Sequence, residues 1–107
     1  MEKYTLVQDL NAVVETISPN SIVSNTFFKE KNLKSILFGF DAGEELSEHT
    51  SNQTAIIQIL EGEATVTLGD DRYELKSGAW VCMPPHLKHS IYAKTPVKML
   101  LTMIGLS

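Results

Sequence analysis

The chain has little cysteine, no clustered positive charge and no long apolar run. Cys82 is the only cysteine in 107 residues, so an intramolecular disulfide is impossible and the disulfide-rich secreted class is excluded. The formal net charge is −4 and no group of Lys and Arg stands out, so nucleic acid is not an expected partner. No run is long enough to span a bilayer, and the first ten residues lack the apolar core of a signal peptide. The composition therefore predicts a cytoplasmic protein with no membrane or nucleic-acid partner.

The first twenty residues carry the only helical pattern of the chain. Apolar residues recur there at spacings of three and four, which places them on one face of a helix. They are Leu6, Leu10, Val13, Val14 and Ile17. Asp9 is suited to cap a shorter helix that starts at Leu10, and the turn formers at 18–21 end the segment. We expect residues 1–20 to form a short amphipathic helical segment packed on a single domain formed by residues 21–107.

From Ile22 onward the pattern becomes that of strands. Short runs rich in β-branched and aromatic residues alternate with turn residues, and no helical segment separates the later runs. Alternation is clearest in residues 63–68, where Ala64, Val66 and Leu68 alternate with threonines. About eight antiparallel strands in a sandwich or barrel are predicted, and a parallel sheet is disfavoured. The acidic stretch 44–48 is interpreted as a solvated loop.

Two strands carry apolar residues on the face that should point outward. Ile56, Gln58 and Leu60 lie opposite the presumed core row of residues 55, 57 and 59, and residues 97–104 are apolar on both faces. Such an outer row indicates a covered surface, and a two-fold homodimer is the commonest cover. We therefore expect the chain to pair with a second copy of itself.

The stretch from Gly78 to His89, GAWVCMPPHLKH, organises the candidate site. A glycine opens a turn, a short apolar strand follows, and Pro84-Pro85 ends that strand, since proline has no N–H to donate. His89 then begins an alternating strand. A second histidine, His49, stands upstream in the segment GEELSEHTSNQT. If the fold brings these two histidines together, they form the chemical centre of the protein.

These features together resemble the small single-domain, conserved-barrel members of the cupin superfamily. Gly43, His49 and Gly62 stand at the spacing of the first cupin motif, and Gly78, Pro84 and His89 at that of the second. The resemblance also extends over FGFDAG at 38–43 and KMLLTM at 98–103, which is nearly the whole chain. It implies an all-β fold, an antiparallel jelly-roll barrel (a double-stranded β-helix), here with one short N-terminal helix.

The resemblance also implies a site at the mouth of the barrel. Most cupins hold a divalent metal there through two histidines and a glutamate of the first motif and one histidine of the second. In this chain His49 and His89 match two of those positions, whereas Ser51 and Ala55 stand where the other histidine and the glutamate belong. The implied cofactor is one divalent transition metal (Zn, Ni, Fe or Mn) or none.

Strand periodicity offers a replacement ligand. If the chain runs extended from His49 to Ala55, residues 49, 51, 53 and 55 share the inner face, and Gln53 points inward beside His49. We therefore predict a metal site of His49, Gln53 and His89. His86 is either a third imidazole at the pocket mouth or an exposed loop residue. The predicted ligand pocket is lined by Ser51, Ala55, Ile57 and Ile91.

Three functions remain open at this point, and no catalytic residue is assigned. The first is binding of a small organic ligand, with a weak or degenerate metal site at His49 and His89. The second is a metal-dependent oxygenase or isomerase that acts on a small organic acid or aromatic compound. The third is a non-catalytic structural or interaction module. Trp80 is expected to be buried or partly buried. Met83, Met99 and Met103 are expected to fill the core or to form soft walls for an apolar ligand.

Overall fold

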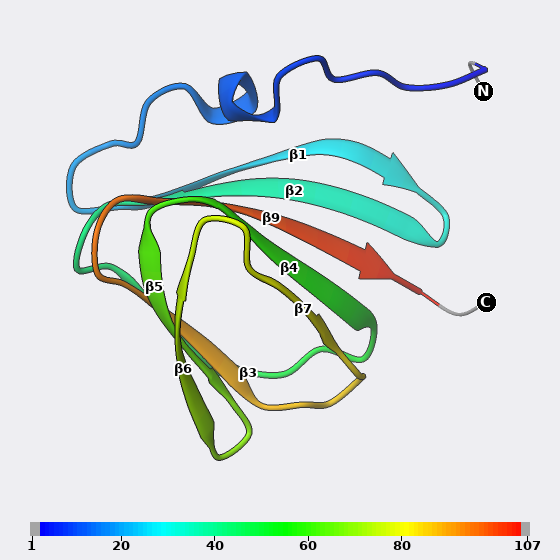
Figure 1. Cartoon of the computed structure of the whole chain (residues 1–107). Coiled ribbons are helices and arrows are strands. Elements are labelled where there is room, and N and C mark those ends of the chain that lie inside the picture. Colours follow the sequence, from blue (N-terminus) through cyan, green and yellow to red (C-terminus); the bar gives the residue numbers. More distant parts are fainter. Residues whose placement is uncertain (1–2, 106–107) are drawn as a thin grey trace.

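The computed structural model describes residues 3–105 as two packed antiparallel sheets (Figure 1). The elements are η1 (Leu10–Val14), β1 (Ile22–Glu30), β2 (Leu33–Phe40), β3 (Glu45–His49), β4 (Thr54–Glu61), β5 (Glu63–Leu68), β6 (Asp71–Lys76), β7 (Trp80–Met83), β8 (His89–Ala93) and β9 (Val97–Ile104). Every strand pair is antiparallel, so the prediction of an all-β antiparallel fold is confirmed. The acidic stretch was misjudged as a loop, because β3 contains most of it.

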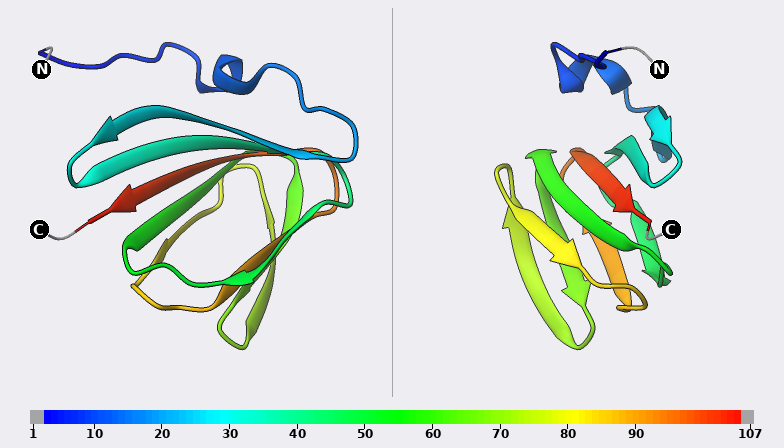
Figure 2. Two further views of the ribbon diagram at one scale, coloured as in Figure 1. Left: turned by 180° about the vertical axis from the view of Figure 1, so that it is seen from behind. Right: turned by 90° about the vertical axis from the view of Figure 1, so that its right-hand side faces the viewer.

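The strand order is that of a jelly roll. One sheet has five strands in the order β1-β2-β9-β4-β7, and the other has four in the order β3-β8-β5-β6. Consecutive strands β4 and β5 belong to different sheets, as do β7 and β8 and also β8 and β9, so the chain passes repeatedly from one layer to the other. Figure 2 shows the two layers enclosing a common interior.

The core lies between the inner faces of the two sheets. In β4, buried residues alternate with partly exposed ones, and the buried residues are Ala55, Ile57 and Ile59. The alternation predicted from the sequence is therefore present in the structure. The buried cluster also contains Phe40, Ala64, Val66, Met83, Ile91, Ala93, Val97 and Met99. Met83 and Met99 are each 1% exposed, which confirms their prediction as core residues. Met103, near the end of β9, is only partly buried and is not part of the core cluster.

The N-terminal segment contains a shorter helix than the sequence suggested. Only Leu10–Val14 is helical, as one 3-10 turn, and the Asp9 side chain accepts a hydrogen bond from the Asn11 N–H as an N-cap does. The prediction of a short helix that starts at Leu10 and is capped by Asp9 is therefore confirmed, whereas the apolar spacing from Leu6 to Ile17 does not form one longer helix. Val13, Val14, Thr16 and Ile17 are all β-branched, so they lose side-chain freedom in an α-helix. The segment packs instead against β1 and β2, which η1 contacts directly.

A glycine at the passage between the sheets is fixed by a close backbone contact. Gly62 joins β4 to β5 at φ 90°, a conformation that favours glycine. A Cβ placed there would lie 2.1 Å from the carbonyl oxygen of Pro96. The turn between the two sheets therefore needs glycine for two separate reasons. Within residues 3–105, no helix is both long and apolar enough to cross a bilayer.

Candidate functional site

The fold brings the two predicted histidines side by side. His49 ends β3 and His89 begins β8, and the two residues are direct cross-strand partners. Their ring centroids are 4.1 Å apart at an interplanar angle of 61°, an edge-to-face contact. The expectation that His49 and His89 lie together is therefore confirmed.

A β-bulge turns His49 to the inner side of its strand. Leu46 pairs with Ile91 and packs against the core, and the register shifts by one residue before His49 pairs with His89. Residues 46 and 49 would face opposite ways in a regular strand, but one extra residue in the bulge returns them to the same face. The bulge is therefore what allows the imidazole pair to form.

Each imidazole is oriented by a backbone carbonyl group. His49 Nδ1 lies 2.9 Å from the Ser47 carbonyl oxygen, and His89 Nδ1 lies 3.0 Å from the Leu87 carbonyl oxygen. A carbonyl oxygen only accepts, so each Nδ1 carries the proton and donates it. In the neutral imidazole the lone pair then belongs to Nε2. The pair thus offers two Nε2 acceptors whose tautomers are fixed by the backbone.

The two histidines differ in their exposure. His89 is 6% exposed, whereas His49 is exposed to solvent. Burial is the largest cause that lowers the pKa of His89, the hydrogen bond to the Leu87 carbonyl oxygen opposes it, and electrostatic repulsion by the neighbouring His49 lowers it further. His89 is therefore held in its neutral form, with His49 as the solvent-facing member of the pair.

The remaining predicted metal ligands do not join the pair. The chain is not extended from His49 to Ala55, because β3 ends at His49 and β4 begins only at Thr54. The side-chain amide of Gln53 lies instead against Gly105, just past the end of β9, with its nitrogen 2.8 Å from where a Cβ of that glycine would be. The prediction that Gln53 shares an inner face with His49 along one continuous strand is therefore wrong. The loop at 50–53 interrupts the period of two on which that prediction depended.

The donor set at the pair does not complete the metal centre that the cupin resemblance implies. Ala55, at the position of the expected glutamate, is an apolar core residue, and Ser51 at the position of the second histidine offers only a hydroxyl group. Among residues 3–105, no group of three or more His, Cys, Asp or Glu side chains is placed to hold a metal ion. A structural or catalytic zinc site generally has at least three such protein ligands. The two imidazoles alone fit a weak, partial site.

His86 lies in the loop that aims His89. It is exposed and has φ 70°, and its N–H donates a 2.7 Å hydrogen bond to the Ser51 carbonyl oxygen. Residues 84–87 form a type II turn. Pro85, at its second position, has φ fixed near −65°, His86 at the third position has the positive φ, and the Leu87 N–H donates to the Pro84 carbonyl oxygen. A type II turn prefers glycine at the position of His86. The backbone of His86 therefore ties the β7–β8 loop to the β3–β4 loop beside the histidine pair.

The residues predicted to line a pocket are placed at or near the interior. Ala55, Ile57 and Ile91 are 4%, 1% and 1% exposed and belong to the core cluster. Ser51 is half-buried in the β3–β4 loop, where its hydroxyl accepts a hydrogen bond from the Gln53 N–H. Trp80 contradicts its prediction, because it lies on the outer face of β7 and is 59% exposed. Period-two alternation with buried Met83 could have given that orientation from the sequence.

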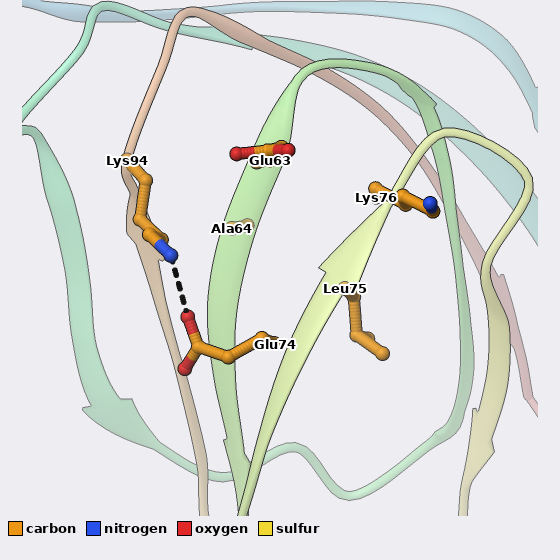
Figure 3. A pocket seen from close by; sticks show the side chains of 6 residues that line it. All are labelled: Glu63, Ala64, Glu74, Leu75, Lys76 and Lys94. Carbon is orange, nitrogen blue, oxygen red and sulfur yellow. Dashed lines mark hydrogen bonds and ion pairs between the residues drawn. The ribbon is translucent and has the colours of Figure 1, made fainter.

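A hollow that the sequence did not indicate lies at the β5–β6 edge of the four-stranded sheet (Figure 3). It has a volume of about 290 Å³, and Glu74 and Lys94 bind each other within it at 3.0 Å. Hydrogen bonds from Lys94 and then from Thr65 lower the pKa of Glu74. The charges of Glu74 and Lys94 are already paired, so this hollow is a weaker candidate site than the histidine pair.

A jelly-roll barrel with facing histidines on β3 and β8 has the architecture of a cupin. The Cupin domain family model matches residues 36–104, which run from β2 to the end of β9. The match covers more than half of the chain and includes both histidines. The chain therefore belongs to the cupin family.

Solved structures agree with this assignment. A conserved protein of unknown function from Streptococcus pyogenes is 28% identical with a TM-score of 0.85, over 98% of this chain and 91% of that one. A cupin superfamily protein from Desulfitobacterium hafniense is 27% identical with a TM-score of 0.81, over 85% and 84% of the two chains. An RmlC-like cupin from Desulfovibrio desulfuricans is 27% identical with a TM-score of 0.76, over 97% and 96%. No curated protein matches the sequence.

Proposed function

We propose that this cupin binds a small organic molecule at the His49–His89 pair and does not depend on a tightly held metal. The observation that carries the proposal is the orientation of both imidazoles, whose Nδ1 atoms donate to the Ser47 and Leu87 carbonyl oxygens. Two preoriented polar groups beside an apolar interior are typical of a small-molecule site. The core residues Ala55, Ile57 and Ile91 lie on the inner faces of the same barrel.

The chemistry of the pair selects a class of ligand. Each Nε2 of the neutral pair accepts a hydrogen bond, so the pair favours a molecule that donates, such as a phenol, an alcohol or an amide. Burial lowers the pKa of His89, which makes a cationic imidazole and hence a salt bridge to an anion less favourable on that side. His49 is exposed and is the member of the pair that an entering molecule reaches first.

Any divalent metal at this site is held weakly in the proposal. His49 and His89 could supply two nitrogen ligands to the metal. Ala55 has no ligating atom at the position where the cupin resemblance implies a glutamate carboxylate. The facial triad of many iron(II) oxygenases needs two histidines and one carboxylate. A cytoplasmic location stays a prediction, supported by the exposed unpaired thiol of Cys82, which suits a reducing compartment.

The test begins with protein purified without a histidine tag. We expect metal analysis to find no stoichiometric Zn, Ni, Fe or Mn, and added Ni²⁺ or Zn²⁺ to raise the melting temperature only at high concentration. A panel of phenols, alcohols and amides is then screened by thermal shift. A saturable shift of the melting temperature reports binding, because a ligand that binds only the folded state stabilises it.

The variants are chosen to separate the pair from its surroundings. His89→Asn keeps a donor near the Leu87 carbonyl oxygen and removes Nε2, and His49→Ala removes the exposed member of the pair. His86→Ala is the matched control, since His86 is an exposed histidine of the adjoining loop. Ligand shifts that survive both pair variants would overturn the proposal. One bound metal per chain that is lost in His49→Ala would instead favour the metal-dependent enzyme.

A further inference from the structure

Two lysines lie opposite each other in the β1–β2 hairpin. Lys29 on β1 and Lys34 on β2 are direct cross-strand partners, so their side chains leave the same face of the sheet. Like charges in such a pair destabilise a sheet. Within residues 3–105, the ion pairs involve Arg72, Lys94 and Lys98 but neither lysine of this pair. The hairpin therefore carries two adjacent positive charges without a carboxylate partner in this part of the chain.

The only acidic residue of the hairpin belongs to the other face. Glu30 follows Lys29 in β1 and pairs with Leu33, so strand alternation directs its side chain away from the lysine pair. The ion pairs of residues 3–105 do not include Glu30 either. The positive charge of the pair thus stays available to a negative group from outside the hairpin.

Protection of a sheet edge accounts for only one of the two lysines. β1 is an edge strand, and a lysine on such a strand hinders pairing with another sheet. Lys29 on β1 serves that purpose. Lys34 does not, because β2 lies between β1 and β9 and has no free edge. Lys34 is also partly buried, where a charge without a partner is more costly than in water.

The lysine pair lies in one row with the candidate site. Lys34 pairs with Met103 of β9, and Met103 pairs with Ala55 of β4. Ala55 belongs to the core cluster, so this row runs along the inner face of the five-stranded sheet. Two strand spacings of about 4.8 Å place the backbone of Lys34 roughly 10 Å from that of Ala55. The loop at 50–53 joins His49 to the start of β4, which lies at the same end of the barrel as the β1–β2 turn (Figure 1).

A hollow lies at the tip of the hairpin. Its volume is about 100 Å³, and it is lined by Lys29, Glu30, Lys31, Leu33, Lys34 and Gln53. This volume is the share of roughly three water molecules, which suits a carboxylate of three heavy atoms. Gln53 is the one lining residue from outside the hairpin, and it comes from the loop that follows His49. The hollow therefore connects the lysine pair to the segment that carries the histidine.

A glycine gives the Gln53 side chain its place beside the hairpin. The amide nitrogen of Gln53 lies 2.8 Å from where a Cβ of Gly105 would be, so a side chain at 105 would displace it. The Gly105 N–H donates to the carbonyl oxygen of Asn32 in the hairpin turn. The backbone N–H of Gln53 donates to the Ser51 hydroxyl, whereas its side-chain amide has no hydrogen-bond partner within residues 3–105. An amide N–H group is thus free to donate to a bound oxygen.

We infer that this hollow binds the carboxylate of the molecule whose hydroxyl group donates to the His49–His89 pair. The inference rests on the proposed function, because it takes the histidine pair as the other end of one site. Lys29 and Lys34 supply charge-assisted hydrogen bonds to the carboxylate, and the Gln53 amide supplies a neutral one. The neutral Nε2 acceptors favour a donor and the lysines favour an anion, so the molecule is bound in one orientation. The ligand class is thereby narrowed to hydroxy acids.

The test compares hydroxy acids with their uncharged esters. The probes are para-hydroxybenzoate, para-hydroxyphenylacetate and para-hydroxyphenylpropionate, each beside its methyl ester, titrated into the full chain by isothermal titration calorimetry. We expect at least one acid to bind about 10-fold or more tightly than its ester, since charge-assisted hydrogen bonds are roughly twice as strong as neutral ones. Added sodium chloride should weaken the acid and leave the ester unchanged, because salt screens exposed charges.

The variants remove the positive charge without touching the histidines. The double variant Lys29→Gln with Lys34→Gln should lower the affinity of the acid to that of the ester and leave the ester unchanged. Lys34→Gln alone should also raise the melting temperature of the free protein, because it ends the contact between like charges. Gly105→Ala displaces the Gln53 amide and should weaken the acid alone. Lys76→Gln is the matched control, since Lys76 is an exposed lysine on β6 of the other sheet.

The outcomes separate this inference from the proposed function. If every acid binds as its ester does, or the double lysine variant keeps the advantage of the acid, the inference is refuted and the histidine site stands. If none of the acids binds, the inference is refuted as well, and the panel of neutral phenols, alcohols and amides still decides the proposed function. If an acid binds through the lysines but is unaffected by His49→Ala and His89→Asn, the two ends do not share one ligand and the proposed function loses its support.

Discussion

The turn at Gly62 allows a direct test of how the two sheets are joined. Gly62 has φ 90°, and an added Cβ would lie 2.1 Å from the Pro96 carbonyl oxygen and 3.0 Å from both its carbonyl carbon and the Thr95 hydroxyl oxygen. Backbone atoms on both sides of this contact belong to the β4–β5 and β8–β9 passages between the sheets. The Gly62→Ala variant therefore cannot relieve the contact by moving a side chain alone.

The expected cost of Gly62→Ala has three contributions. A non-glycine residue in a left-handed conformation costs about 1–2 kcal/mol, and overpacking costs about 1–3 kcal/mol. Alanine also restricts the unfolded chain, which returns about 0.4–1 kcal/mol. The net loss of unfolding free energy is thus about 1–4.6 kcal/mol. Urea denaturation followed by circular dichroism measures this loss.

Gly78→Ala is the matched control for the steric part of this cost. Gly78 has φ 99°, close to that of Gly62, but a Cβ there would meet no atom within 4 Å. Only conformational strain remains, so we expect a net loss of about 0–1.6 kcal/mol. If the two variants lost the same stability, the close approach of Pro96 to Gly62 would not limit that turn, and the reasoning would be refuted.

Three further predictions concern the histidine loop and the core. His89 has a pKa lowered from the ordinary 6.5, so its contribution to stability is complete above 6.5 and is lost as the pH falls through the folded value. His89→Asn should flatten this loss in urea titrations of metal-free protein, and an unchanged pH profile would contradict it. His86→Gly relieves a positive φ and should stabilise the protein by up to about 1 kcal/mol, whereas a clear loss of stability would show that the imidazole makes a needed contact. Ile57→Ala should cost about 2–5 kcal/mol by leaving a cavity in the core, and Ile56→Ala on the outer face of the same strand should cost less in the monomer.

The fold was predictable because its signals are local and repeated. Alternation of apolar and polar residues, with turn residues between strands, is enough to indicate antiparallel layers. Gly43, Gly62 and Gly78 all have positive φ, so the glycines that carried the cupin resemblance are also positions where the backbone favours glycine. The histidines of both motifs follow at fixed spacings from such glycines. The cupin resemblance therefore implied that the two histidines meet, and the structure confirms it.

The site itself depended on features that no local pattern specifies. The bulge in β3 restores His49 to the inner face, and the loop at 50–53 releases Gln53 to lie against Gly105. Assigning faces by strict alternation fails at both places, because one extra or irregular residue moves every later side chain to the other face of the strand. The orientation of both imidazoles by backbone carbonyl groups is likewise a property of the paired strands.

The N-terminal segment likewise has features that the sequence predicts and others that depend on the tertiary structure. Its sequence determined a row of apolar residues, and their spacing of three and four suggested a short amphipathic helical segment. Contact with the outer side of β2 buries Val14 in a five-residue 3-10 turn instead. The sequence by itself thus determined where the apolar residues stand, but not which of them the fold covers, since Leu6 of the same segment is 67% exposed. Only the tertiary structure decided their geometry, because packing against the sheet outweighs a helix propensity of a few tenths of a kcal/mol per residue.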